Sequence, residues 1–334
     1  MATLKSQRYE LRLRHTFRLA RGASDSRENL LIEIEDDGLV GRGEAAPIAR
    51  YGQDWRSAAA AVERMFERLD DLRAFDNVRA LTVAGQPAAA AALDMALRDL
   101  AGQRCGLPVW RMLGLDRRQM PVTSMTIGLD EPEIVQQKVE EAAGFAVLKV
   151  KMGTDDDRQV IEAVREVTDR PLWVDANEGW TLDGAAERLA WLADQGVELV
   201  EQPLPEGELE AMRELRRRSP LPIFADESVH NAADIPRLAE AFDGINIKLM
   251  KCGGLGEALR MIAVARAHGM KIMIGCMVES SLAITAAAQL APLIDHADLD
   301  GNLLVANDPF QDAGGVRVVD GALVLSDAPG LGLR

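Results

Sequence analysis

The chain has 334 residues, of which 48% are hydrophobic and 27% are charged, with a formal net charge of −15. This length and composition predict a compact globular protein, either one large domain with a smaller one or a barrel with additions. The net negative charge disfavours nucleic acids and anionic membrane surfaces as partners, because both are bound through clustered Lys and Arg side chains.

The N-terminal segment and the cysteines bear on cellular location. The first residues alternate polar and apolar side chains without the apolar core of a signal peptide, and no apolar run approaches the roughly 20 residues that span a bilayer. The three cysteines are widely spaced, which predicts neither a disulfide framework nor a zinc site. We therefore expect a cytoplasmic protein.

Residues 3–50 are predicted to form a small antiparallel sheet. Short runs of alternating polar and apolar residues flank Asp36-Asp37-Gly38, which is a hairpin-type turn sequence. Two helices are predicted next, over 57 to about 72 and over 86 to about 105, because apolar residues recur there at helical spacing. We expect these elements to form an α+β domain over residues 1–118.

From residue 120 onward the sequence alternates short apolar runs with amphipathic helical stretches. Polar or charged residues follow most of the runs, at intervals of about 25 residues. A β/α unit that recurs at this interval favours a closed parallel barrel, in which functional residues collect at the carboxyl ends of the strands. A doubly wound open sheet is the alternative, but no G-x-G-x-x-G follows an early strand. The predicted strands are 122–127, 146–150, 172–174, 198–200, 222–225, 245–249, 271–274 and 297–299.

We predict that the barrel domain covers residues 119–302. The remaining segment, 303–334, contains a second hairpin signal at Asp320-Gly321 and is expected to return to the first domain.

Lys149 and Lys151 lie two residues apart at the second predicted strand, so their side chains share a face. If that face is the barrel interior, desolvation and the like charge lower the pKa of a lysine toward neutrality, which suits a general base. The alternative is that both lysines face solvent at the strand end. Lys248, in the sixth strand, is a further inward candidate, while Lys251 is assigned to the turn that follows.

Three carboxylates follow the third, fourth and fifth strands and converge on one mouth of the barrel: Asp175, Glu201 and Asp226. Buried carboxylates at such close quarters do not stay ionised together without cations. An all-oxygen set of this kind suits Mg²⁺. Alternatively, each carboxylate only caps the helix that follows it, although three in successive units favour the metal site.

These motifs resemble the enolase superfamily, in its muconate lactonizing enzyme-like subgroup, and within that subgroup the dipeptide epimerases. The resemblance covers essentially the whole chain. RLARGASDSREN and GEAAPIARYG resemble the lid loops of the capping domain, and AALDMALRDLAGQRCGLPVWRMLG resembles its last helix. The barrel motifs are LKVKMG, VDANEGW, VEQPLP, ADES and NIKLMKCGG. The resemblance implies a modified TIM barrel, (β/α)7β, with an α+β N-terminal capping domain.

The resemblance also implies a role for each matching position. Lys151 and Lys248 would be the two acid/base catalysts, and Lys149 would lower the pKa of Lys151 and help to neutralise the enolate. A substrate carboxylate held by the metal would favour loss of the α-proton. The metal ligands would be Asp175, Glu201 and Asp226. The neighbouring positions are Asn177 and Glu227, for which a structural role is the alternative, and the substrate contacts are Ser124, Arg21, Tyr51 and Met277.

Asp298 and Asp300 present paired carboxylates at the eighth strand end. Dipeptide epimerases resemble this chain there, and in them the pair holds the free α-ammonium of the substrate; a solvated loop pair is the alternative. The implied reaction is a Mg²⁺-dependent 1,1-proton transfer at the α-carbon of the C-terminal residue of a dipeptide such as L-Ala-L-Glu, through an enolate intermediate.

One departure concerns the second side chain of the substrate. In the first lid loop, the Ala-Glu-specific members have a sequence similar to ARGSR, whose second Arg faces the acidic side chain. This chain has Ala23-Ser24 at that place. Arg21, Arg27 and Arg50 are candidates to replace that arginine, or else the preferred dipeptide lacks Glu. The sequence leaves open the side-chain preference, the pathway, and whether the protein is a homo-oligomer.

Other activities on the same scaffold are o-succinylbenzoate synthase, N-acylamino acid racemase and cycloisomerase. The synthase and the cycloisomerase have no ammonium group to bind, so Asp298 and Asp300 speak against them. A non-catalytic barrel is disfavoured, because buried like charges are costly unless they are used.

Overall fold

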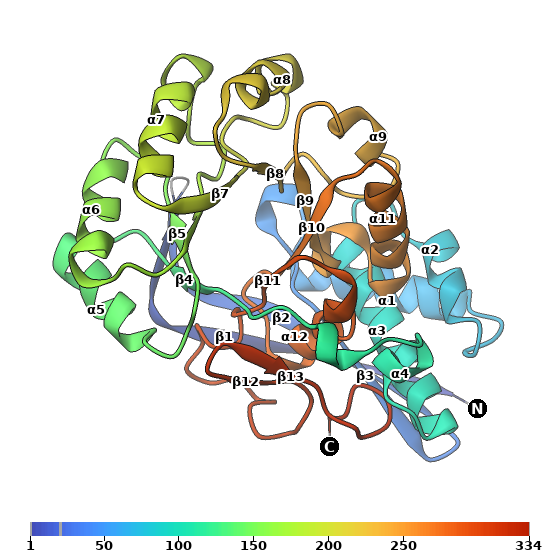
Figure 1. Ribbon diagram of the computed structural model, residues 1–334. Helices are drawn as coiled ribbons and strands as arrows, with labels where there is room; N and C mark the ends of the chain where they lie inside the picture. The colour runs from blue at the N-terminus through green and yellow to red at the C-terminus, as the bar shows by residue number, and fades with distance from the viewer. Residues whose placement is uncertain (1, 20–21, 334) are drawn as a thin grey trace.

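The computed structural model describes residues 2–19 and 22–333 (Figure 1). The chain begins with a three-stranded antiparallel sheet of β1 (Thr3–Leu19), β2 (Gly22–Asp36) and β3 (Leu39–Ala45). The predicted turn joins β2 to β3, and Asp37 and Gly38 have φ angles of 51° and 77°, as a type I′ hairpin requires. The predicted sheet is confirmed, although β1 is much longer than the short runs indicated.

Helix α3 (Pro87–Cys105) is buried on nearly all sides. One side packs closely on β3, where a Cβ at Gly43 would lie 1.9 Å from the carbonyl oxygen of Ala92, so only glycine permits this approach. Another side contacts α10 (Leu249–Cys252), which belongs to the barrel. Helix α3 therefore joins the sheet to the barrel. Its bounds confirm the helix predicted over 86 to about 105.

The other helices of this part are short. Helix α1 (Trp55–Glu67) begins with a capping box between Asp54 and Ser57 and ends before the predicted residue 72. The remaining helical elements are η1 (Ala49–Tyr51), η2 (Phe75–Asn77), α2 (Val78–Leu81), α4 (Val109–Met112) and η3 (Arg117–Gln119).

Eight parallel strands form the second sheet, and each neighbours the next one along the chain. The first and last strands meet through the backbone, because the Ser124 amide donates a hydrogen bond to the carbonyl of Ala297 at 3.0 Å. This closed sequential order confirms the barrel and rules out the doubly wound sheet. The strands are β4 (Met125–Ile127), β5 (Leu148–Lys151), β6 (Leu172–Asp175), β7 (Val197–Glu201), β8 (Ile223–Ala225), β9 (Gly244–Lys248), β10 (Lys271–Gly275) and β11 (His296–Asp298).

Helices separate all consecutive strands of the barrel and surround it on the outside (Figure 1). The arrangement is the predicted (β/α)7β barrel with an α+β capping part. The helices are α5 (Pro132–Glu141), α6 (Asp157–Val167), α7 (Leu182–Asp194), α8 (Leu209–Arg218), α9 (Ile235–Leu238), α10, α11 (Leu255–Ala267) and α12 (Ser281–Ala288), with η4 (Ala291–Leu293) before β11.

An apolar layer fills the barrel near the start of the strands. It consists of Val147, Trp173, Leu199, Phe224 and Met273, which are all buried. The ring of His296 completes the layer, with its centroid 5.1 Å from that of Trp173. Since side chains two apart on a strand share a face, the next inward positions lie one layer closer to the carboxyl ends, where Lys149, Asp175 and Glu201 are found.

The C-terminal segment forms the predicted hairpin of β12 (Arg317–Val319) and β13 (Ala322–Val324). The tail then contacts the capping part, where the Leu331 amide donates to the Asp99 carboxylate on α3 at 2.8 Å. The domain boundaries at 118/119 and 302/303 stay predictions.

Backbone hydrogen bonds join β1 to the loop that follows β11. The Arg14 amide donates to the carbonyl of Leu304 at 2.9 Å, and the Ala306 amide donates to the carbonyl of Arg12 at 2.7 Å. The hairpin of β1 and β2 is thus attached to the barrel at the rim where β11 ends.

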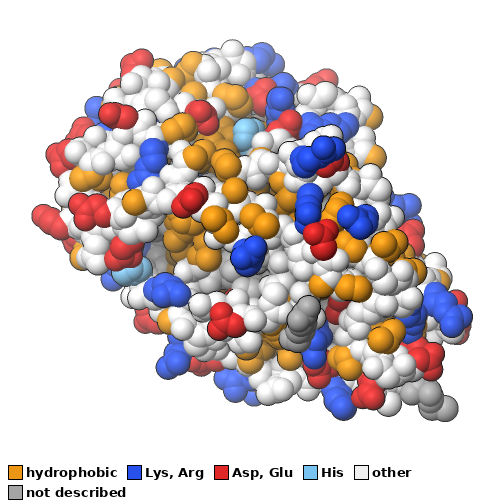
Figure 2. Space-filling view, turned by 60° about the horizontal axis from the view of Figure 1, so that its bottom comes forward, with side chains coloured by type: hydrophobic (Ala, Val, Ile, Leu, Met, Phe, Trp, Pro, Cys, Tyr) orange, Lys and Arg blue, Asp and Glu red, His pale blue; other side chains and the backbone are white. Residues whose placement is uncertain are grey.

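The surface mixes charges of both signs. Figure 2 shows Lys and Arg side chains interspersed with Asp and Glu side chains over one face of the molecule, so the negative net charge does not gather in a single patch there. Within residues 2–19 and 22–333, no helix combines the length and apolar character that crossing a membrane requires.

Candidate active site

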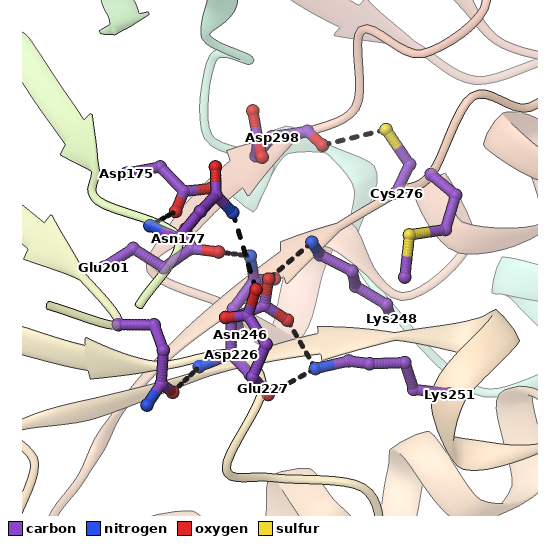
Figure 3. A network of polar contacts seen from close by, with 12 residues as sticks. Asp175, Asn177, Glu201, Asp226, Glu227, Asn246, Lys248, Lys251, Cys276 and Asp298 are labelled. Carbon is purple, nitrogen blue, oxygen red and sulfur yellow. Dashed lines mark hydrogen bonds and ion pairs between the residues drawn. The ribbon is translucent and has the colours of Figure 1, made fainter. Parts of the chain in front are cut away.

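Three buried carboxylates meet at the carboxyl ends of β6, β7 and β8. One oxygen each from Asp175, Glu201 and Asp226 lies within 4.8 Å of the others, and Figure 3 shows the three groups around one space. The N-cap positions of the following helices α7, α8 and α9 are Thr181, Glu208 and Asp234, so the helix-capping alternative is wrong. The predicted convergence is confirmed. Because all the donor atoms are carboxylate oxygens, the set fits a hard divalent cation such as Mg²⁺.

Lys149 lies fully buried beneath these carboxylates. Its Nζ is 2.7 Å from an oxygen of Glu201, 2.7 Å from an oxygen of Asp298 and 3.3 Å from an oxygen of Asp175. The lysine faces the barrel interior, so the solvent-facing alternative is wrong for Lys149.

Lys151 and Lys248 approach the cavity from opposite walls. The Nζ of Lys151, on β5, lies 2.7 Å from Asp175, and the Nζ of Lys248, on β9, lies 2.7 Å from Asp226. Counting β9, β8, β7, β6, β5 places these strands four apart in a closed barrel of eight, which is diametrically opposite. Both lysines line the same cavity.

The predicted lowering of the pKa is wrong for Lys149. Burial lowers the pKa of Lys149, but the negative charges of Asp298, Glu201 and Asp175 outweigh burial and raise the pKa well above its usual value. The pKa of Lys248 is raised in the same way, chiefly by Asp226 against the effect of burial. Burial and the neighbouring lysine are local features of the sequence, whereas the carboxylates that raise the pKa of Lys149 come from other strands.

Lys251 is a functional candidate that the sequence analysis placed in a turn. It lies instead in the short helix α10 and is buried. Its ammonium contacts both the carbonyl oxygen and the carboxylate of Asp226, so Lys248 and Lys251 hold the two oxygens of one carboxylate (Figure 3).

Asn246 is a second group that the sequence analysis missed. Its Nδ2 donates to Oε1 of Glu201 at 2.9 Å from a fully buried position on β9. A Cβ at Gly275, on the adjacent strand, would lie 2.6 Å from the Asn246 amide oxygen, so glycine there leaves room for the amide. Asn246 lies two residues before Lys248 on the same strand, and that spacing could have revealed it.

Asn177 and Glu227 lie beside the carboxylates, as predicted. The Asn177 amide donates to Oδ1 of Asp175 at 3.0 Å, and its side-chain nitrogen lies 3.5 Å from Oε1 of Glu227. Asn177 has a φ of 45°, a left-handed conformation that Asn tolerates better than most residues. Their proposed role next to the ligands stays a prediction.

Asp298 and Asp300 form a buried pair at the end of β11, so the solvated-pair alternative is wrong. Asp298 accepts a hydrogen bond from the Ser124 hydroxyl at 2.8 Å, and Asp300 accepts one from the Thr126 amide at 2.6 Å. Burial and the charge of Asp298 raise the pKa of Asp300 to about 6. Ser124 is fully buried behind Asp298 and does not line the cavity, so it acts on a ligand only through that carboxylate.

A cavity of about 630 Å³ opens above these groups, between the barrel and the capping sheet. Tyr51 and Met277 line it, as predicted, whereas Arg21 lies outside the described residues. Tyr51 belongs to η1, where the Arg50 guanidinium lies 2.5 Å from Glu178 of the barrel. This ion pair fixes η1 over the rim of the cavity.

The barrel, the carboxylate cluster and the two opposed lysines define a metal-dependent proton-transfer enzyme. Residues 133–334 match the family model for an enolase C-terminal domain-like region, and residues 2–114 match the mandelate racemase / muconate lactonizing enzyme N-terminal domain. The chain belongs to the enolase superfamily, among its dipeptide epimerases.

Relatives with known activities resemble the chain over nearly its whole length. The L-Ala-D/L-Glu epimerase of Bacteroides thetaiotaomicron is 43% identical, over 97% of this chain and 86% of that protein. The hydrophobic dipeptide epimerase of Roseobacter litoralis is 40% identical, over 96% of each. The dipeptide epimerase of Enterococcus faecalis, solved with Mg and L-Leu-L-Tyr, superimposes with a TM-score of 0.91 at 36% identity, covering 99% of this chain and 98% of that one.

Proposed function

We propose that the protein inverts the configuration at the α-carbon of the C-terminal residue of a dipeptide, and that L-Ala-L-Glu is its substrate. The observation that carries the proposal is that Lys151 and Lys248 reach one cavity from opposite walls of the barrel. A lysine on one side of the α-carbon removes its proton and the lysine on the other side returns one, which reverses the configuration. The cytoplasmic location predicted from the sequence is part of this proposal.

The three clustered carboxylates are the proposed ligands of Mg²⁺. When bound, the cation supplies positive charge to the substrate carboxylate and so lowers the barrier to loss of the α-proton. The proposal is supported by the fit of the oxygen set, in which Asp175, Glu201 and Asp226 lie within reach of one ion. Asn246 and Lys251 keep Glu201 and Asp226 in place through their hydrogen bonds.

Asp298 and Asp300 are the proposed site for the free α-ammonium of the dipeptide. Both are buried and line the cavity, and an ammonium group there would be held by charge-assisted hydrogen bonds. Lys149 forms an ion pair with one oxygen of Asp298. Among the described residues, no ion pair involves Asp300. The lyases of the same scaffold have no ammonium to place there.

The test is deuterium exchange in D₂O with Mg²⁺. L-Ala-L-Glu should exchange the α-hydrogen of its Glu residue and gain the other configuration at that carbon. Lys151→Ala and Lys248→Ala should each abolish epimerisation. Lys271 is an exposed lysine on β10, and the control variant Lys271→Ala should remain active. Turnover of a cyclohexadiene succinate without exchange in any dipeptide would assign the protein to the lyases instead.

A further inference from the structure

Four cationic side chains line the cavity within the described part of the chain. Three of them have acidic partners: Lys151 pairs with Asp175, Lys248 with Asp226 and Arg50 with Glu178. The fourth is Arg27, whose guanidinium donates a hydrogen bond to the carbonyl of Ser26 at 2.9 Å. No carboxylate among the described residues lies within ion-pair distance of Arg27.

Arg27 points toward the barrel because of its position on β2. Alternate residues of this strand, Leu30, Ile32 and Ile34, are buried in the apolar core. Asn29 is on the opposite face, and its side chain donates to the carbonyl of Val278 in the loop after β10 at 3.1 Å. Arg27 shares that face two residues nearer the tip of the hairpin, so its side chain projects over the mouth of the barrel.

The guanidinium of Arg27 is half-buried without a compensating charge. Burial lowers its pKa, which shows that the surroundings do not favour the cation. Removing a charge from water costs free energy unless an opposite charge is close, and a guanidinium is shaped to accept a carboxylate through two parallel hydrogen bonds. A carboxylate brought into the cavity by a ligand would therefore find its best partner here.

We propose that Arg27 selects an acidic side chain at the C-terminal residue of the dipeptide by pairing with its carboxylate. The inference rests on the proposed function, since it assigns one end of the same cavity. Of the other arginines weighed from the sequence, Arg50 is engaged by Glu178 and Arg21 lies outside the described residues. Ala23 and Ser24 occupy the place at which the Glu-specific members carry an arginine, and neither residue is charged.

The experiment compares L-Ala-L-Glu with L-Ala-L-Gln, which has the same shape and no side-chain charge. For the unmodified enzyme, kcat/KM should favour the Glu dipeptide. Arg27→Met should lower kcat/KM for the Glu dipeptide by about 10- to 100-fold, mainly through KM, and should affect the Gln dipeptide far less. Arg27→Lys should retain part of the preference, because it keeps the charge and loses the two-point geometry.

Arg12→Met is the matched control, since Arg12 is an exposed arginine on the neighbouring strand β1 that does not line the cavity. It should leave the ratio of the two kcat/KM values unchanged. Activity of Arg27→Met on the Gln dipeptide shows that the variant is folded. An unchanged ratio in Arg27→Met overturns the inference while the epimerase assignment stands. Failure of the unmodified enzyme to exchange any dipeptide overturns the proposed function itself.

Discussion

Lys151 on β5 faces Lys248 on β9 across the barrel, and both ammonium groups border the same cavity. Each lysine can therefore reach only one face of a carbon held between them. In Lys248→Ala, one stereoisomer of the dipeptide should still exchange its α-hydrogen through Lys151, but neither isomer should invert. In Lys151→Ala, the other stereoisomer should exchange.

Proton NMR of each stereoisomer in D₂O measures this directly, as loss of the α-hydrogen signal without appearance of the other isomer. Exchange of both isomers by a single variant would show that one lysine serves both faces, contrary to the geometry of the barrel.

Asp300 should control binding of the substrate ammonium. Asp300→Asn is expected to lower kcat/KM for a dipeptide by about 10- to 100-fold, because a charged hydrogen bond is lost. The loss should be much smaller for the N-acetylated dipeptide, which has no ammonium. If the variant loses activity equally on both substrates, the carboxylate has another role.

The pH dependence of kcat/KM should report the same group. The pKa of Asp300 is raised to about 6, so the carboxylate is ionised above that pH and neutral below it. Since only the ionised form attracts an ammonium, kcat/KM should fall as the pH drops through about 6. The ratio of unmodified enzyme to Asp300→Asn should shrink toward one over the same range. A ratio that is constant with pH would contradict the assignment.

Arg50 should hold η1 closed over the substrate. Its guanidinium contacts Glu178 at 2.5 Å and Glu206 at 3.8 Å, from two different barrel loops. Arg50→Gln should raise KM by about 3- to 10-fold with a smaller change in kcat, because partly exposed ion pairs contribute modestly. Arg64→Gln, an exposed arginine on α1, is the control. Unaltered KM in Arg50→Gln would show that η1 is held by its packing alone.

Glu279 should make stability depend on pH. It is buried, and burial together with the charge of Glu44 raises its pKa to about 8, against 4.5 for an ordinary Glu. Between these values the unfolded chain has lost the proton and the folded chain keeps it, so stability falls as the pH rises. The slope from this group is at most about 1.4 kcal/mol per pH unit.

Urea unfolding at pH 5, 6, 7 and 8 tests this dependence. The free energy of unfolding of Glu279→Gln should fall less steeply with pH than that of the unmodified protein. Parallel curves would mean that Glu279 is ionised in the folded state at neutral pH.

The barrel was predictable because each strand is a short apolar run followed by a polar residue. The carboxyl ends of parallel strands lie together at one end of a barrel. The convergence of Asp175, Glu201 and Asp226 therefore followed from their positions at the ends of three successive strands. β1 was harder, because the stretch around Arg14 and His15 carries no apolar pattern and interrupts the pairing with β2. Arg14 is held there by the hydrogen bond from its amide to the distant carbonyl of Leu304.

The electrostatics of the site could not be predicted from the local sequence. Lys149 and Lys151 are neighbours in the chain, but the charges that set the pKa of Lys149 come from three other strands. Lys251 precedes two glycines, which indicated a turn, and only the fold shows that α10 directs it back to Asp226. The orientation of a short helix and the distances between side chains on different strands are set only when the barrel is assembled, so the local sequence does not reveal them.

The backbone hydrogen bonds that tie β1 to the loop after β11 give the cavity a fixed span. That loop begins next to Asp300, and the Arg12 carbonyl it engages lies beside Leu11, which pairs with Arg27 across the hairpin. The strand that carries Arg27 and the loop that carries Asp300 are thus connected through main-chain hydrogen bonds. A dipeptide that used both groups would therefore have to match, with its ammonium and its acidic side chain, a separation that the main chain sets.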